Sequence, residues 1–206
     1  MTISLSDTGK RYNRDWIFRR LTYQFCSGTS YAIVGPNGSG KSTLLQAISG
    51  ALLINEGSIG YEQNGVPIAD DRVHGYLSFC APYLELIEEM TATELLDFHR
   101  QFKPLMPGID TATALQLAGL GTTKNKQIRY FSSGMKQRLK LAQAFFSDTP
   151  LLLLDEPCTN LDKEGIALYQ SLLNDFTKDR IVIIGSNVSA EYATCQAQLA
   201  IHDHKQ

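Results

Sequence analysis

Residues 35–43 read Gly35-Pro36-Asn37-Gly38-Ser39-Gly40-Lys41-Ser42-Thr43, and this stretch decides the fold. The apolar residues 31–34 before it predict a buried strand, and residues 44–48 after it predict a helix. Its glycines let the backbone curl so that successive N–H groups point inward, forming a nest for phosphate oxygens at a helix N-terminus. A strand, a glycine loop and a helix in this order predict an α/β protein.

Two side chains of this loop add chemistry to the backbone nest. Lys41 brings a mobile cation for the β and γ phosphates of a nucleoside triphosphate, and the Ser42 hydroxyl can ligate Mg²⁺. The alternative is an ordinary glycine-rich turn between a strand and a helix. The complete GxxxxGKS pattern between a strand and a helix favours the phosphate site.

Composition limits the classes of protein to which the chain can belong. It has 206 residues, of which 43% are hydrophobic and 19% charged, as expected for one ordered globular domain. The formal net charge of −2 gives no global attraction to nucleic acid or to an anionic membrane, although a local patch stays an alternative. No apolar run approaches the ~18 residues that span a bilayer, so we expect no direct membrane insertion. The scattered cysteines predict neither disulfides nor a zinc site and indicate a reducing cytosol.

The N-terminal part predicts antiparallel strands. Residues 3–25 alternate in short apolar runs, which are broken by Asp7-Thr8-Gly9 and by a basic stretch around Arg19-Arg20. An Asn-Gly turn within residues 63–66 predicts a hairpin. Residues 74–79 predict a further strand.

Two aromatic residues upstream of the phosphate loop are candidates for contact with a nucleotide base. Tyr12 or Trp16 could lie flat against an adenine ring. Alternatively, each is an amphipathic aromatic side chain on a half-buried strand. The residues alone leave both interpretations open.

Residues 85–120 change to a helical period. Apolar side chains there fit two amphipathic helices, which Pro104 and Pro107-Gly108 interrupt. We therefore predict a helical subdomain of residues 83–129, inserted into a nucleotide-binding core of residues 1–82 and 130–206. The apolar positions of these helices are Leu95, Leu96, Phe98, Phe102, Ala112, Leu115, Leu117, Ala118 and Leu120.

An unbroken aliphatic run, Leu151-Leu152-Leu153-Leu154, ends in Asp155 and Glu156. Only a strand buried on both faces needs such a run, and carboxylates at its C-terminal end point into the crevice where α/β sheets bind ligands. We expect Asp155 to hold Mg²⁺ through water and Glu156 to polarise an attacking water. The alternative is a helix N-cap or a solvated turn.

Three further segments complete the predicted core. Residues 131–138 place serines and a glycine at the start of a long helix, which an ordinary serine N-cap also explains. A helix is predicted for about residues 163–176, followed by a buried strand at 181–184 that ends in Gly185-Ser186-Asn187. A last short strand is expected at residues 198–202.

Over essentially its whole length, the chain resembles the ATP-binding subunit of an ABC transporter. The motifs follow the order and spacing of that family: residues 35–43 match Walker A, 151–156 Walker B with its catalytic glutamate, 131–135 the signature usually written LSGGQ, and Thr159-Asn160-Leu161-Asp162 the D-loop. Tyr12 aligns best with the adenine-stacking aromatic. The resemblance implies a P-loop NTPase with a mostly parallel sheet, an N-terminal antiparallel β subdomain and an inserted helical subdomain.

The resemblance also implies a mechanism and partners. ATP and Mg²⁺ would lie between two chains in a head-to-tail dimer, with Ser132 and the Gly134 N–H of one chain on the γ-phosphate held by the other. A homodimer is expected. The helical subdomain would contact a transmembrane permease, which places the protein in the cytoplasm on the inner face of the cell membrane. The short length resembles export-type subunits such as the ATPase of the haem exporter.

The sequence departs from the family pattern at the signature and at two γ-phosphate-sensing positions. The signature has Ser133 and Met135 in place of a glycine and a glutamine. Cys80 stands nearest the place of the Q-loop glutamine, and cysteine is a poor ligand for Mg²⁺. Asn187 replaces the switch histidine, so it can hydrogen-bond a phosphate but cannot become a cation. Two outcomes then stay open: slow hydrolysis by the expected catalytic set of Glu156, Lys41 and Asn187, or a pair of sites of which one is degenerate.

Two alternative functions follow. One is a soluble ABC ATPase that acts on ribosomes, DNA repair or metal-cluster assembly, although such proteins usually carry paired domains or long insertions. The other is a regulatory module that binds ATP with weak catalysis, which the identities of Cys80 and Asn187 would suit.

Overall fold

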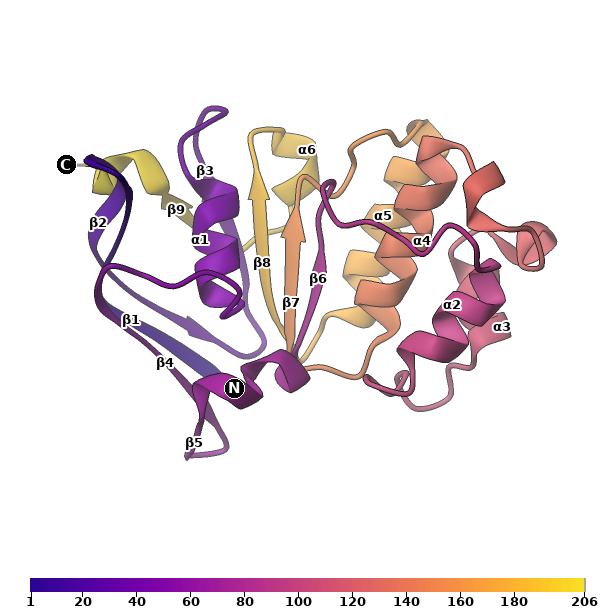
Figure 1. Ribbon diagram of the computed structural model, residues 1–206, viewed down its shortest axis with the longest axis horizontal. Coiled ribbons are helices and arrows are strands. Elements are labelled where there is room, and N and C mark those ends of the chain that lie inside the picture. The colour runs from indigo at the N-terminus through magenta and orange to yellow at the C-terminus, as the bar shows by residue number, and fades with distance from the viewer. Residues whose placement is uncertain (206) are drawn as a thin grey trace.

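Two sheets and a group of helices lie side by side in the computed structural model, which describes residues 1–205 (Figure 1). A parallel sheet has the order β6-β7-β8-β3-β9, and an antiparallel sheet has the order β2-β1-β4-β5. The predicted α/β core with an antiparallel N-terminal subdomain is therefore confirmed. The parallel strands are β3 (Ser30–Val34), β6 (Leu77–Cys80), β7 (Leu151–Asp155), β8 (Ile181–Ser186) and β9 (Ala197–Ala200).

Helices cover both faces of the parallel sheet. Helix α1 lies between the two sheets, and α4 and α5 cover the opposite face, with α2 and α3 beyond them (Figure 1). The helices are α1 (Lys41–Ile48), α2 (Ala92–His99), α3 (Thr111–Leu117), α4 (Ser133–Phe146), α5 (Lys163–Phe176) and α6 (Ser189–Tyr192). Within residues 1–205, no helix combines the length and apolar character that crossing a membrane would require.

The aliphatic strand β7 divides its side chains between two hydrophobic cores. Leu151 and Leu153 pack with α1 and the antiparallel sheet, whereas Leu152 and Leu154 pack with α4 and α5. Successive residues of a strand point to opposite faces, so a strand covered on both faces must be apolar throughout. All four leucines are fully buried, as the unbroken run predicts.

The expected breaks within residues 3–25 do not end the strands of the antiparallel sheet. Strands β1 (Thr2–Tyr12) and β2 (Asp15–Cys26) form one long hairpin that turns at Asn13 and Arg14. Asp7 and Arg20 lie inside these strands with φ of 49° and 52°, as irregularities of the pairing. Polar residues here mark bulges, which keep a strand paired while adding one residue. The predicted Asn-Gly hairpin joins β4 (Glu56–Gln63) to β5 (Val66–Ile68).

Two predicted strands begin or end differently because their neighbours limit them. The strand expected at residues 74–79 begins only at Leu77, where pairing with β7 begins, and Asp70–Tyr76 form the 3-10 helix η1. The strand expected at residues 198–202 is β9, which ends where its partner β3 ends. Ile201–His204 then form the 3-10 helix η4.

The helical segment lies between β6 and β7 in the sequence. Helix α2 begins with a capping box of Thr91 and Glu94, and α3 begins at the Asp110 cap. Five of the nine expected apolar positions lie in the core that includes α4: Leu95, Leu96, Leu115, Ala118 and Leu120. Phe98 and Phe102 instead meet edge to face with 45% and 70% of their surfaces exposed, and Ala112 and Leu117 are also exposed. Short 3-10 helices η2 (Gly121–Thr123) and η3 (Ile128–Tyr130) connect α3 to α4.

A buried arginine joins the sheet to the end of α4. Arg180 is 5% exposed and donates to the Phe145 carbonyl at 2.8 Å and to the Thr149 hydroxyl at 2.8 Å. It also donates to the Ser78 hydroxyl at 2.9 Å. Burial lowers the pKa of the guanidinium to about 10, so it stays charged at neutral pH beside the negative end of the α4 dipole.

Replacing Arg180 with methionine should lower the free energy of unfolding by about 3 kcal/mol, because buried carbonyl and hydroxyl acceptors lose their donors. Chemical denaturation followed by circular dichroism measures this change. The matched control is Arg129→Met, which removes only a solvent-exposed ion pair of 3.9 Å with Glu89 and should change stability by about 0.5 kcal/mol or less. Equal effects of the two substitutions would contradict the structural role of Arg180.

Candidate functional site

The phosphate loop follows β3 and leads directly into α1. Gly35 and Gly40 have φ of 156° and 106°. A Cβ at Gly40 would lie 2.3 Å from Ile17 Cγ2, and one at Gly35 would lie 2.6 Å from Ser39 Oγ, so both positions require glycine. Helix α1 has no side-chain cap, which leaves its first N–H groups directed toward the loop. This arrangement is the predicted anion nest.

Lys41 closes over the loop from the first turn of α1. Its side chain is buried, and its Nζ donates to the carbonyls of Gly35 at 2.9 Å and Pro36 at 3.2 Å. Within residues 1–205, Lys41 makes no ion pair. A buried ammonium held only by carbonyl dipoles favours an anion beside it.

Asp155 lies at the carboxyl end of β7, next to the Ser42 hydroxyl. The carboxylate is 1% exposed, and neither of its oxygens has a hydrogen-bond partner among residues 1–205. Burial raises the pKa of Asp155, while the nearby Ser42 hydroxyl acts in the opposite direction. An unpaired buried carboxylate beside a hydroxyl is a donor set of hard oxygens, which fits Mg²⁺.

Mg²⁺ usually takes one or two protein oxygens and completes its shell with water and phosphate. In the described part of the chain, no group of three or more His, Cys, Asp and Glu side chains could hold a metal ion alone. Asp155 and Ser42 therefore match a metal site that a nucleotide completes, rather than a cage made only of protein.

Glu156 follows in a left-handed conformation, with φ of 43°. Its backbone N–H donates to the Gly185 carbonyl on β8 at 2.9 Å. This bond holds the strained residue at the strand end. Glu156 is partly exposed beside the buried Asp155, as a residue that acts on water requires.

Asn187 reaches the phosphate loop from the end of β8. Its Nδ2 donates to Asn37 Oδ1 at 2.9 Å, although the two residues are 150 positions apart in the chain. The parallel pairing of β3 with β8, from Ser30 opposite Val182 to Val34 opposite Ser186, produces this contact. Asn187 therefore lies beside the predicted phosphate loop.

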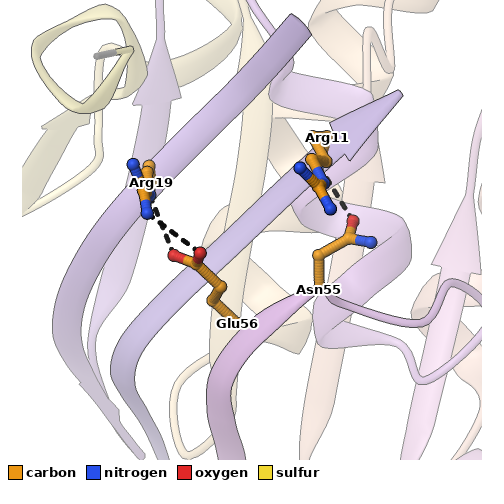
Figure 2. A network of polar contacts seen from close by, with 4 residues as sticks. All are labelled: Arg11, Arg19, Asn55 and Glu56. Atoms are coloured by element: carbon orange, nitrogen blue, oxygen red, sulfur yellow. Dashed lines mark hydrogen bonds and ion pairs between the residues drawn. The ribbon is translucent and has the colours of Figure 1, made fainter. Parts of the chain in front are cut away.

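The two candidate aromatics differ in their surroundings. The Arg19 and Arg11 guanidinium carbons lie 4.4 and 5.4 Å from the centre of the Trp16 ring. Arg19 in turn forms two bonds to Glu56, as Figure 2 shows. Tyr12 is 47% exposed, with the Lys10 ammonium 5.1 Å from its ring centre, so it is the better placed aromatic for a base.

The signature residues start helix α4. The Ser132 hydroxyl accepts a bond from the Met135 N–H at 3.3 Å, as an N-cap does. A Cβ at Gly134 would lie 3.0 Å from the Asn160 carbonyl, so the D-loop packs closely here. Among residues 1–205, neither residue hydrogen-bonds the phosphate loop of its own chain.

Cys80 does not point into the site. It is fully buried in the core beneath α4, and its sulfur accepts a weak bond from Gln137 Nε2 at 3.7 Å. Burial raises the pKa of the thiol to about 12, so no thiolate forms at neutral pH. The residue at the expected glutamine position is therefore a structural one.

Two buried polar residues near the site carried no recognisable sequence signal. Gln137 Nε2 donates to the Pro157 carbonyl at 2.7 Å, and Glu191 Oε1 accepts from the Cys158 N–H at 3.0 Å. Both bonds hold the segment that follows Glu156. Burial raises the pKa of Glu191. A glutamine within an apolar helix period was the only available hint, and it applies to Gln137 alone.

Known proteins resemble this chain over most of its length. An ABC transporter ATP-binding protein of Bacillus subtilis, YybJ, is 31% identical over 192 residues, which cover 90% of this chain and 85% of the relative. The cytochrome c biogenesis ATP-binding export protein CcmA of Xylella fastidiosa is 35% identical over 153 residues, covering 74% of this chain and 68% of CcmA. A solved structure of an ABC transporter ATP-binding protein from Pyrococcus furiosus shares the fold, with a TM-score of 0.84, 24% identity and 100% coverage of both chains.

The family comparison covers most of the motifs described above. The ABC transporter model matches residues 18–159, which run from β2 through the phosphate loop and α4 to the start of the D-loop. Its match includes Lys41, Ser132 and Asp155. The chain belongs to the ABC transporter family.

Proposed function

We propose that this chain hydrolyses ATP as the motor subunit of a transporter whose membrane-spanning part is a separate permease. One observation carries the proposal: the ends of β3, β7 and β8 bring Lys41, Asp155 with Glu156, and Asn187 to one edge of the sheet. The chain's relatives in export support the transport function, and the substrate would be selected by the permease.

The phosphate loop would bind the β and γ phosphates through its backbone N–H groups and the start of α1. Lys41 would move its ammonium from the Gly35 and Pro36 carbonyls to the phosphate oxygens. The ammonium would then pair with a negative charge instead of with two carbonyl dipoles. Asp155 and Ser42 are the residues that would hold Mg²⁺, which supplies neutralisation of phosphate charge when bound.

Glu156 would orient and polarise a water for attack on the γ-phosphorus as the bond to the bridging oxygen of ADP breaks. The bond from its backbone N–H to the Gly185 carbonyl fixes the residue at the strand end, so less reorganisation would be needed to place the carboxylate. Asn187 would donate a hydrogen bond to a γ-phosphate oxygen. It supplies position but no charge.

A second copy of the chain would complete the site. The start of α4 has unpaired backbone N–H groups and an exposed serine, Ser132, and neither is used within the chain's own phosphate site. In a head-to-tail dimer, Ser132 and the Gly134 N–H would face the γ-phosphate of the partner. In a two-fold homodimer, each chain would complete the phosphate site of the other.

The location follows from the proposed permease. The protein would lie in the cytoplasm against the inner face of the cell membrane, with the α2 and α3 region as the part nearest the permease. A regulatory ATP-binding module with weak catalysis is the second candidate, and the uncharged Asn187 favours it.

Glu156→Gln should lower ATP turnover by about 100-fold, because the amide cannot polarise water. With ATP, the variant should stay dimeric on size-exclusion chromatography, while the wild type returns to monomer. Glu164→Gln is the control, since Glu164 is an exposed residue of the first turn of α5 and should behave as wild type. Unchanged turnover in Glu156→Gln would contradict its assigned role.

Asn187→His should raise turnover by about tenfold, since a histidine adds partial positive charge near the γ-phosphate. Steady-state phosphate release measures the change, with Asn174→His on the exposed face of α5 as control. Turnover that is unchanged or lower would mean that the site has adapted to asparagine, and it would favour the regulatory module.

A further inference from the structure

A tight turn lies over the end of β7. Strand β6 pairs with β7 up to Cys80 opposite Leu154, which brings Ala81 alongside Asp155. The Leu84 N–H then donates to the Ala81 carbonyl at 3.3 Å, so Pro82 and Tyr83 occupy the two corners of the turn. The turn thus begins where the metal-binding carboxylate is buried.

This turn is held from two sides. Lys140 on α4 donates to the Pro82 carbonyl at 2.8 Å and to the Ala81 carbonyl at 3.4 Å. The Tyr83 ring packs edge-on against Phe79, with ring centres 6.4 Å apart. The Lys140 bond restrains the backbone of the turn, and the Phe79 contact restrains the Tyr83 ring, which is 47% exposed.

Phe79 pairs with Leu153, and Leu153 lies on the same face of β7 as Asp155, so the Tyr83 ring that packs on Phe79 lies on the face of the sheet that carries Asp155. A phenol carries its proton at neutral pH and can donate a hydrogen bond. Yet both carboxylate oxygens lack a direct partner among residues 1–205. The two groups are neighbours that remain available to a common ligand.

We propose that Tyr83 is a positioning residue of the ATP site, whose hydroxyl orders the oxygen ligands gathered at Asp155 when a Mg²⁺–nucleotide is bound. This inference rests on the proposed function. The family resemblance predicts a glutamine at the position of Cys80. Because Cys80 is buried beneath α4, its role near the metal passes to Tyr83. A phenol suits this position because it donates to anionic oxygen without adding charge.

The test compares nucleotide affinity with and without metal. Isothermal titration of the full chain with the non-hydrolysable analogue AMP-PNP, in Mg²⁺ and in EDTA, gives the factor by which Mg²⁺ tightens binding. Tyr83→Phe removes only the hydroxyl, so its affinity in EDTA should match wild type, while the Mg²⁺ factor should fall by about tenfold. Tyr83→Gln, which restores a donor, should recover part of that factor.

Tyr76→Phe is the matched control, because Tyr76 lies in η1 at the opposite end of β6. It should leave both affinities unchanged. An unchanged Mg²⁺ factor in Tyr83→Phe would overturn the role of Tyr83 and leave the proposed function intact. Equal losses in Mg²⁺ and EDTA would also overturn it, since they would indicate a general packing effect. If the wild type binds AMP-PNP equally tightly in Mg²⁺ and in EDTA, the result would contradict the proposed function and the role of Tyr83 with it.

Discussion

The buried carboxylate of Asp155 is the constraint on which the rest of the site depends. A charge with 1% exposure and no hydrogen-bond partner within residues 1–205 is unfavourable, and the chain places Ser42 and Lys41 near it without neutralising it by an ion pair. A cation shared with phosphate would remove that cost. The sheet order provides the surroundings: β3 carries the phosphate loop, β8 leads to Asn187, and β6 leads to Tyr83. Parallel strands place all these ends at one edge, so segments that are far apart in the sequence meet there.

Helix α4 connects the parts that must respond to bound nucleotide. Gln137 holds the carbonyl after the catalytic glutamate, Lys140 holds the turn that carries Tyr83, and Arg138 pairs with Asp162 of the D-loop at 2.9 Å. The same helix begins at Ser132, which would face a second copy. A rigid helix with bonds at successive turns moves as one body, so displacement of its N-terminus would be felt by both carboxylate-bearing segments. In the proposed dimer, packing within each chain would link the two phosphate sites.

The sequence specified the phosphate loop and the Asp155-Glu156 pair because their chemistry depends on local order along the chain. It specified less where a side-chain direction depends on a distant strand. Cys80 and Tyr83 are close in sequence, yet pairing with β7 turns Cys80 into the core and the following turn brings Tyr83 back toward Asp155. Strand ends were missed for the same reason, since β6 and β9 extend only as far as their partners. Trp16 and Tyr12 look alike in sequence, and only the arginines around Trp16 distinguish them.

Asparagine at position 187 changes how the site can sense phosphate. An amide nitrogen carries two donors, and one of them is bonded to Asn37 on the phosphate loop at 2.9 Å. The second donor can therefore contact a γ-phosphate oxygen while the first keeps β8 joined to the loop. A neutral histidine offers a single ring N–H and would have to choose between the two partners. Asn187 thus exchanges charge for a fixed bridge between strand and loop, and it removes a group that titrates near neutral pH. That bridge joins the predicted phosphate loop to the strand beside Glu156. In the proposed function, geometry rather than charge would therefore be the signal that a γ-phosphate is present.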